Sequence, residues 1–284
     1  MRYILVLLSV LLVISCQQKP TKVLSQETVQ GGDQNTLDKF KKDNPAVLDV
    51  RSPFEFNLMH MPTAINVRWE DFSQTDAHVR GLLQNDLFAI ARRLSLIGID
   101  PDRKVLVVGK GLRGQGEEGR VAWTLKVLGV KNVMTLNHDH FREANPRESN
   151  PPVENKPYWK PQVDESLYVD VKEFKTLVTD SKSPVQVLDV RSKSEFQQEN
   201  ISKSKKVTAV ITNMDWKSFF AGNGSARTDI ESILQAKGIS KDQIILIMSN
   251  HGVRSAAVTY ALREAGFKNA RNFAGGIEQW RTVK

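Results

Sequence analysis

The stretch AVLDVRSPFEF at residues 46–56 recurs as QVLDVRSKSEF at residues 186–196. Two further matches follow in the same order: VLVVG (105–109) with ILIMS (245–249), and LKVLGVKNVMTL (125–136) with LREAGFKNARNF (262–273). The first two matches are 140 residues apart and the third 137, and similarity that repeats at a nearly constant long spacing indicates a duplicated structural unit. The sequence therefore predicts two similar domains in tandem.

Each copy of the repeat reads as an alternation of helices and strands. A helix-like lead-in comes first (LDKFKK, VKEFKTLV), then a strand ending in LDVR, a helical SxxEF segment, a further helix, an apolar strand, a turn and a last helix. This order predicts an α/β fold in which each domain is a parallel sheet with helices on both faces.

The domain limits follow from a break in this periodicity. The proline-rich stretch RESNPPVENKPYWKPQ interrupts it between 147 and 162, as is typical of a linker. We predict a first domain at 35–147, a linker at 148–162 and a second domain at 163–284.

The N-terminus MRYILVLLSVLLVISC combines Arg2, an apolar run too short to span a bilayer and a small-residue end at Cys16. It resembles a bacterial lipoprotein signal at 1–15. The resemblance implies a lipid on Cys16, a flexible tether at 16–34 and a location in the bacterial cell envelope, outside the cytoplasm. Gln17 favours the outer membrane if the organism is Gram-negative. An ordinary secretory signal and a short membrane anchor are the alternatives.

The charge and the cysteine content exclude several kinds of function and of site. The chain has 40 Lys and Arg against 32 Asp and Glu, a net charge of +8, but the basic residues are interleaved with acids. This favours a solvated basic surface over a nucleic-acid or anionic-lipid patch, so no nucleic-acid partner is predicted. The single cysteine, Cys16, excludes disulfides within the chain and a cysteine-based metal site. No cofactor and no metal are predicted.

The apolar run 244–248 predicts a buried strand that leads through a short turn into a helix. A strand, a glycine-containing turn and a helix N-terminus present a ring of backbone N–H groups that favours negative charge. The predicted anion-binding loop consists of Ser249, Asn250, His251, Gly252, Val253 and Arg254. In it, Arg254 is expected to supply a positive group at the helix start.

These motifs together resemble the tandem rhodaneses, a family of two-domain sulfurtransferases. LDVRSPFEFNLMHMPTAINV is similar to the family's LDVRxxxEFxxGHIPGAINV, with Met59 and Thr63 replacing two glycines, and the second copy is eroded to ENISKSKKV. SNHGVRSA stands where the family has CxxGxRSA, and NFAGGIEQW matches its closing GGxxxW. Trp280 of that motif is expected to anchor the core.

The resemblance implies that Ser249 occupies the position of the family's catalytic cysteine. That cysteine takes a sulfane sulfur from a donor such as thiosulfate, holds it as a persulfide and passes it on. A serine hydroxyl cannot do so, and the first copy continues after Gly109 as KGLRGQGEEGR, without cysteine. No catalytic residue is therefore assigned.

The leading hypothesis is a catalytically silent binding or interaction module that uses the second-domain loop or the cleft between the domains. Its partner would be a small anion (sulfate, thiosulfate or phosphate-like) or an envelope protein. One alternative is a sulfurtransferase-related protein that works with a partner's thiol. Another is a serine- or phosphate-directed hydrolase using Ser249 and His251, although His251 is rather predicted to be an exposed loop residue.

The repeated Asp–Arg pairs end buried strands, where charges are normally held in hydrogen-bonded pairs. Asp189 and Arg191, like Asp49 and Arg51 in the first copy, are predicted to brace the neighbouring loop.

Other acidic residues are expected at helix starts, where a carboxylate suits the helix dipole. Glu55 and Glu195 are predicted in the first turn of a helix. Some tandem rhodaneses carry a basic residue at the position of Glu195, where it assists anionic donors, so the resemblance implies that the acid here argues against thiosulfate as a donor. Glu117 and Glu118 are predicted to begin a helix of the first domain, to satisfy that helix terminus themselves and to repel an incoming anion.

The segment LNHDHF, which stands where the family has Gly-Gly, contains His138, Asp139 and His140. It is predicted to be a solvated loop rather than a metal site.

Overall fold

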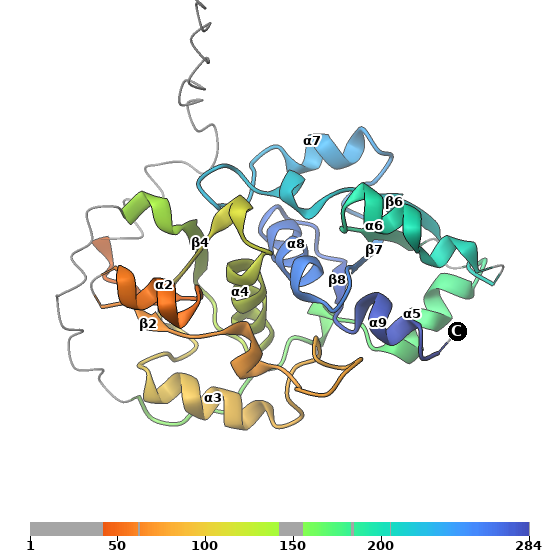
Figure 1. The fold of residues 1–284 in the computed structure, drawn as a ribbon. Coiled ribbons are helices and arrows are strands. Elements are labelled where there is room, and N and C mark those ends of the chain that lie inside the picture. Colours follow the sequence, from red (N-terminus) through yellow and green to blue (C-terminus); the bar gives the residue numbers. More distant parts are fainter. Residues whose placement is uncertain (1–41, 62, 142–155, 183–184, 205, 284) are drawn as a thin grey trace, which may run out of the picture.

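The computed structural model describes residues 42–61, 63–141, 156–182, 185–204 and 206–283. They form two sheets of parallel strands with the same strand order, β2-β1-β3-β4 and β6-β5-β7-β8 (Figure 1). The prediction of two similar α/β domains is confirmed. The strands are β1 (Ala46–Asp49), β2 (Ile65–Asn66), β3 (Val105–Gly109), β4 (Val133–Asn137), β5 (Val185–Asp189), β6 (Val210–Asn213), β7 (Ile244–Met248) and β8 (Ala270–Phe273).

Helices cover the sheets in both domains (Figure 1). The first domain contains α2 (Pro53–Leu58), η1 (Trp69–Phe72), α3 (Leu87–Leu96), η2 (Gly111–Arg113), α4 (Glu117–Val127) and η3 (His138–Phe141). The second contains η4 (Glu165–Leu167), α5 (Val171–Thr179), α6 (Lys193–Gln198), η5 (Ile201–Lys203), η6 (Trp216–Phe219), α7 (Ile230–Gln235), α8 (Val253–Glu264) and α9 (Gly276–Trp280). The η elements are 3-10 helices.

The central strands are apolar because both faces of each sheet are covered. All five residues of β3 are buried, as are the last four of β7. In the second domain, one apolar cluster lies between the sheet and α7 and α8, and another gathers α5, α9 and Trp280, which is buried as expected. The site lies where these central strands end.

The LDVRSxxE motif builds the same local structure twice. Arg51 bonds Asp49 at 2.6 Å and donates to the carbonyl of Met59 at 2.6 Å; Arg191 bonds Asp189 at 2.6 Å and donates to the carbonyl of Glu199 at 2.6 Å. The carbonyls lie just beyond α2 and α6, so each buried pair ties a strand end to the end of the following helix.

The serine that follows each pair caps the next helix. Ser52 accepts from the N–H of Glu55, whose side chain bonds back to the N-cap, and Ser192 and Glu195 repeat this capping box. The two acids therefore lie in the first helical turn, as predicted.

The domains meet along α4 and α8, which lie side by side in the centre of Figure 1. Gly119 faces Ala257: a Cβ added to the glycine would stand 2.5 Å from the alanine Cβ. Each domain also sends a loop onto the other. The N–H of Asn137 donates to the carbonyl of Asn223 at 2.7 Å, and Arg80 bonds Glu278 at 2.5 Å. The sequence did not predict this reciprocal contact.

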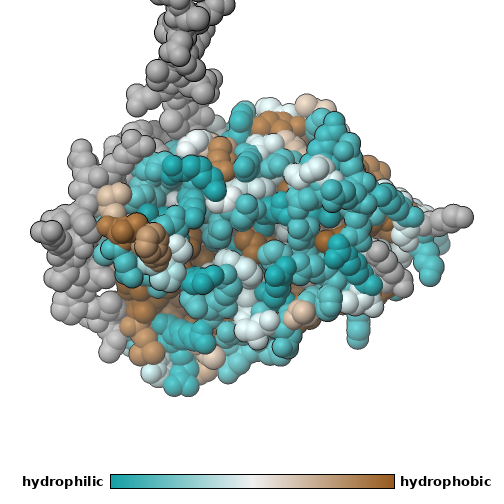
Figure 2. Space-filling model, viewed as in Figure 1, coloured by the Kyte–Doolittle hydropathy of each residue, from teal (hydrophilic) through white to brown (hydrophobic). Residues whose placement is uncertain are grey.

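The visible face of the molecule is mainly hydrophilic, with separate hydrophobic patches, one of them over α2 (Figure 2). Phe54 and Leu58 of that helix are 73% and 63% exposed. Among the described residues, no helix is long and apolar enough to cross a membrane. The predicted signal, the lipidation of Cys16 and the tether lie outside the described residues.

Candidate functional site

Ser249 lies at the end of β7 and is 1% exposed. Its Oγ accepts from the N–H groups of Gly252 at 3.2 Å and Ser255 at 3.3 Å and lies 3.1 Å from the Ser255 Oγ. Two backbone N–H groups at the start of α8 thus converge on the Ser249 hydroxyl. The serine hydroxyl is therefore the acceptor at the place where the sequence predicted an anion.

Gly252 makes the turn possible. Its φ of +83° is in the left-handed region, and a Cβ there would overlap the carbonyl of Ala274. Both the backbone conformation and the close approach of Ala274, the residue after β8, therefore require glycine.

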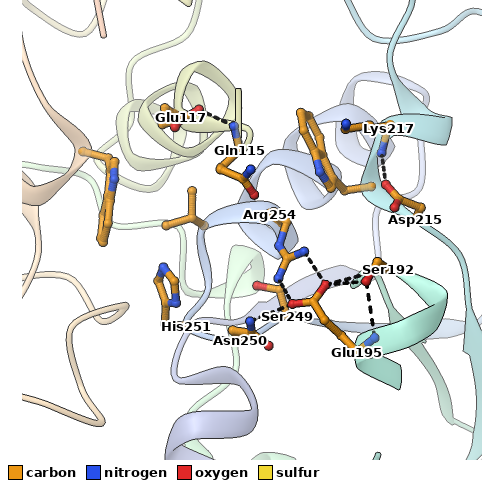
Figure 3. A pocket seen from close by; sticks show the side chains of 13 residues that line it. Gln115, Glu117, Ser192, Glu195, Asp215, Lys217, Ser249, Asn250, His251 and Arg254 are labelled. Carbon is orange, nitrogen blue, oxygen red and sulfur yellow. Dashed lines mark hydrogen bonds and ion pairs between the residues drawn. The ribbon is translucent and has the colours of Figure 1, made fainter. Parts of the chain in front are cut away.

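Arg254 does not face the cavity as a free cation, contrary to the expectation from sequence. Its two terminal nitrogens each lie 2.8 Å from one carboxylate oxygen of Glu195, and Asn250 Nδ2 donates to the same carboxylate at 2.8 Å (Figure 3). The Arg254 guanidinium holds the pKa of Glu195 well below its usual range. Glu195 thus takes the place at Arg254 that an incoming anion would need.

His251 is not the exposed loop residue that the sequence predicted. Its ring stacks on Trp69 of the first domain with centroids 5.8 Å apart, and Nδ1 lies 3.3 Å from Arg80 Nη2 and 3.4 Å from Glu278 Oε1. Burial, and next the charge of Arg80, lower the pKa of His251, so the imidazole is neutral at pH 7. The Ser249 Oγ bonds to Gly252 and Ser255 at the start of α8 and not to His251, so the geometry gives no support to a Ser249–His251 hydrolytic pair.

A cavity of about 520 Å³ opens between the two domains beside this turn (Figure 3). We call it the interdomain cavity. Its lining is Trp69, Gln115 and Glu117 from the first domain and Ser192, Glu195, Asp215, Trp216, Lys217, Ser249, Asn250, His251, Val253 and Arg254 from the second.

The matching turn of the first domain is filled in a different way. The alignment of 125–136 with 262–273 places Glu118 against Ser255. The Glu118 side chain is buried and accepts a hydrogen bond from the Gly111 N–H, and a Cβ added to Gly109 would overlap its carboxylate. Burial raises the pKa of Glu118 to about 8. Glu118 therefore fills the site as a largely neutral acid, and the prediction that it repels anions there was wrong.

Glu117 stands where the second domain has Arg254, which reverses the charge. As predicted, α4 begins at this residue. Its Oε2 accepts from the N–H of Gln115 at 2.6 Å. Glu55, the counterpart of Glu195, therefore has no arginine to bind at this place and instead pairs with Lys110 at 2.9 Å.

The segment predicted as a solvated loop is partly buried. His138 is 7% exposed, and its Nε2 has no partner among the described residues. Burial comes before the charge of Arg51 among the causes that lower the pKa of His138. Within the described part of the chain, no group of three potential metal ligands occurs.

Sequence reasoning missed the two tryptophans of the cavity. Trp69 and Trp216 begin η1 and η6, equivalent elements that follow β2 and β6. The signal was present, because RWEDF (68–72) and DWKSF (215–219) stand at corresponding places in the two copies.

Comparison with known proteins places this geometry in a family context. The rhodanese-like domain model matches residues 33–139 and again 170–282. The adenylyltransferase and sulfurtransferase UBA4 of Lodderomyces elongisporus is 26% identical over 133 residues, which are 47% of this chain and 25% of that protein. The chain thus spans about a quarter of the length of this curated relative.

Solved structures share the fold at low sequence identity. SseA from Escherichia coli, a 3-mercaptopyruvate sulfotransferase, superposes with a TM-score of 0.66 at 20% identity, covering 88% of this chain and 99% of that one. Tum1 from Saccharomyces cerevisiae gives a TM-score of 0.66 at 17% identity over 88% and 94% of the two chains.

Proposed function

The chain belongs to the rhodanese-like family and carries two copies of its domain, and from this premise we propose that it is a non-catalytic member that binds a small ligand in its interdomain cavity. The observation that carries the proposal is the position of the Ser249 hydroxyl, which fills the ring of N–H groups where the family's chemistry requires a thiolate.

The chemistry of sulfur transfer supports the absence of turnover. A thiolate attacks the outer sulfur of thiosulfate, an S–S bond forms and sulfite leaves; a cyanide acceptor then takes the sulfur and regenerates the thiolate. A serine hydroxyl is not ionised at neutral pH and forms no persulfide. The first domain offers Gly109 at the same place, and the only cysteine of the chain is Cys16.

The interdomain cavity supports a binding role. It is concave, combines aromatic and polar walls, and has a volume in the range of small-molecule sites. Both domains contribute to it, and the packing of α4 on α8 fixes their relative position. A preformed site of this kind binds without the cost of ordering mobile segments.

We also propose that a lipid on Cys16 anchors the protein in a bacterial envelope, facing outside the cytoplasm. The support is the apolar run that ends in Val13, Ile14, Ser15 and Cys16. Mass spectrometry of the membrane-extracted protein is expected to find an acylated N-terminal Cys16. A chain that starts at another residue without a lipid contradicts this proposal.

The test of the catalytic proposal is thiocyanate formation from thiosulfate and cyanide by the purified chain. We expect no turnover above the uncatalysed background. The same assay with Cys16→Ala is the control for sulfur carried by the one cysteine. Turnover that persists in Cys16→Ala overturns the proposal, because no thiol then remains in the chain.

A further inference from the structure

Helix α2 of the first domain presents two large apolar side chains to solvent. Phe54 and Leu58 are four residues apart and therefore lie on one face of the helix, and they are 73% and 63% exposed. The other side of the helix packs on the sheet, where Phe56 is partly buried against the apolar cluster that contains Val47 and Val108. The hydrophobic patch over α2 in Figure 2 is thus separate from the core.

The second domain shows that the fold does not require these two side chains. Its helix α6 begins with the same capping box, and the spacing of the repeat places Ser194 at the position of Phe54 and Gln198 at that of Leu58. Both are exposed although the preceding helix α5 is in place. The described elements of the repeat therefore leave this surface open, and in the first domain it is available to a contact outside the fold.

The proposed lipid anchor determines what lies within reach of α2. Cys16 and Lys42, the first described residue, are 26 residues apart, a stretch that spans at most about 90 Å when fully extended. In Figure 1 the described chain begins, in red, at the same end of the molecule as α2. A lipid on Cys16 therefore keeps α2 close to the surface of the bilayer.

A bilayer suits the patch better than a second copy of the chain. Two side chains are a small surface compared with the roughly 800 Å² that each partner contributes to a stable protein interface. A tether holds the patch near the bilayer at an effective concentration in the millimolar range, so that a weak contact is sufficient. Aromatic and aliphatic side chains on one face of a helix are favourable at the boundary between headgroups and acyl chains.

The charges of α2 are compatible with an anionic bilayer. Glu55 is the one charged residue of the helix, and it is paired with Lys110 at 2.9 Å. The helix therefore carries no unpaired acid that would be repelled by lipid phosphates.

We propose that α2 docks on the membrane surface, with Phe54 and Leu58 inserted at the level of the lipid headgroups. The second domain, with Ser194 and Gln198 at the equivalent positions, makes no such contact. The inference rests on the proposed lipid anchor and goes beyond it, because it names the face of the protein that meets the membrane.

The test uses the chain from Cys16 onward, coupled through its only cysteine to a maleimide lipid in vesicles of phosphatidylethanolamine and phosphatidylglycerol. Hydrogen exchange followed by mass spectrometry compares the peptides that contain α2 and α6 in the coupled chain and in the free chain. We expect exchange in α2 to slow about tenfold on coupling, and exchange in α6 to stay unchanged.

The decisive variant combines Phe54→Ser with Leu58→Gln, which gives α2 the residues that α6 carries. Its α2 is expected to exchange as fast in the coupled chain as in the free one. Val210→Thr is the matched control, because Val210 is 65% exposed on β6 of the second domain, and it should leave the protection of α2 in place. Unchanged exchange in β3 and β7 shows that the variants are folded.

Three outcomes overturn the inference. Exchange in α2 that is equal in the coupled and the free chain does so, as does protection that persists in the double variant. Protection that appears in the free chain and grows with protein concentration assigns the patch to a second copy of the chain instead.

Failure of the inference is distinguishable from failure of the proposed anchor, because the maleimide lipid supplies an anchor in either case. A native protein without a lipid on Cys16 rejects the proposed anchor. A coupled chain without protection of α2 rejects only the docking of this helix.

Discussion

The turn after β3 in the first domain and the turn after β7 in the second are equivalent, but different side chains occupy the space inside them. In the second domain Ser249 turns its own hydroxyl into the ring of N–H groups. In the first, Gly109 has no side chain, and Glu118 reaches back from α4 to occupy the space. Neither turn is empty, because buried N–H groups need an acceptor.

The charges beside the turns differ in the same way. Arg254 of the second domain is paired with Glu195, whereas Glu117 of the first has no cationic partner among the described residues. The second turn thus pairs its arginine with an acid of the same domain, whereas the first contributes the Glu117 carboxylate to the interdomain cavity. The backbones differ as well, because the first turn contains the 3-10 helix η2, whereas the second leads from Met248 to Val253 without one.

The largest expected effect is on the backbone of the second turn. Gly252→Ala puts a Cβ against the carbonyl of Ala274 at a φ of +83°, whereas Gly238→Ala has a φ of +75° but nothing within 4 Å of the new atom. Both variants are strained because alanine disfavours the left-handed conformation, and Gly252→Ala also introduces a steric clash. We expect losses in the free energy of unfolding of about 4 and about 1 kcal/mol.

Urea denaturation of both variants measures this difference. Equal losses would show that the backbone conformation alone, and not the approach of Ala274, requires glycine at residue 252.

The next effect is a difference between the two turns in how the free energy of unfolding depends on pH. Burial raises the pKa of Glu118 from 4.5 to about 8, so the folded state binds this proton more tightly than the unfolded state. The stabilisation is fully present below pH 4.5 and is lost as the pH rises towards 8. We expect the chain to lose about 3 kcal/mol from this group between pH 5 and 8, and Glu118→Gln to abolish that loss.

Glu195 provides the matched case of opposite sign. Its pKa is lowered, mainly by Arg254, so its contribution is present above pH 4.5 and is lost as the pH falls below that value. Glu195→Gln should therefore flatten the acid side of the stability profile and Glu118→Gln the alkaline side. Identical profiles for the two variants would contradict the assignment of different charge states to the two turns.

Much of this fold could be predicted from the sequence because the same sequence pattern occurs in both domains. The matches of 46–56 with 186–196 and of 105–109 with 245–249 located the buried strands, and their LDVRSxxE motif specifies a capping box that depends only on neighbours in the chain. A structure that depends only on neighbouring residues forms in both copies of the repeat.

The site was less predictable because its contacts join residues far apart in the chain. That Arg254 meets Glu195, and that His251 stacks on Trp69, depends on how elements from different parts of the fold come together. No spacing rule in the sequence encodes those distances. Glu118 was misjudged for the same reason: its position at a helix start is local, but its burial follows from the space left by Gly109.

The smallest expected effect concerns the reactivity of a restored thiol. Serine and cysteine are nearly the same size, so Ser249→Cys should place sulfur where the N–H groups of Gly252 and Ser255 now meet Oγ. Burial opposes a thiolate, but those two donors and the N-terminus of the 12-residue helix α8 favour it. We expect the donors to prevail and the thiol pKa to lie about one unit below the ordinary value of ~8.5.

Adding Glu195→Gln to Ser249→Cys frees Arg254 from its carboxylate and is expected to lower the thiol pKa by a further half unit or so. Adding Glu55→Gln instead should leave it unchanged, because that carboxylate serves the turn of the other domain. The rate of alkylation by iodoacetamide as a function of pH measures all three values. A thiol that titrates at or above ~8.5 in every variant would mean that burial outweighs the donors, and the second turn would then no longer stabilise an anionic group.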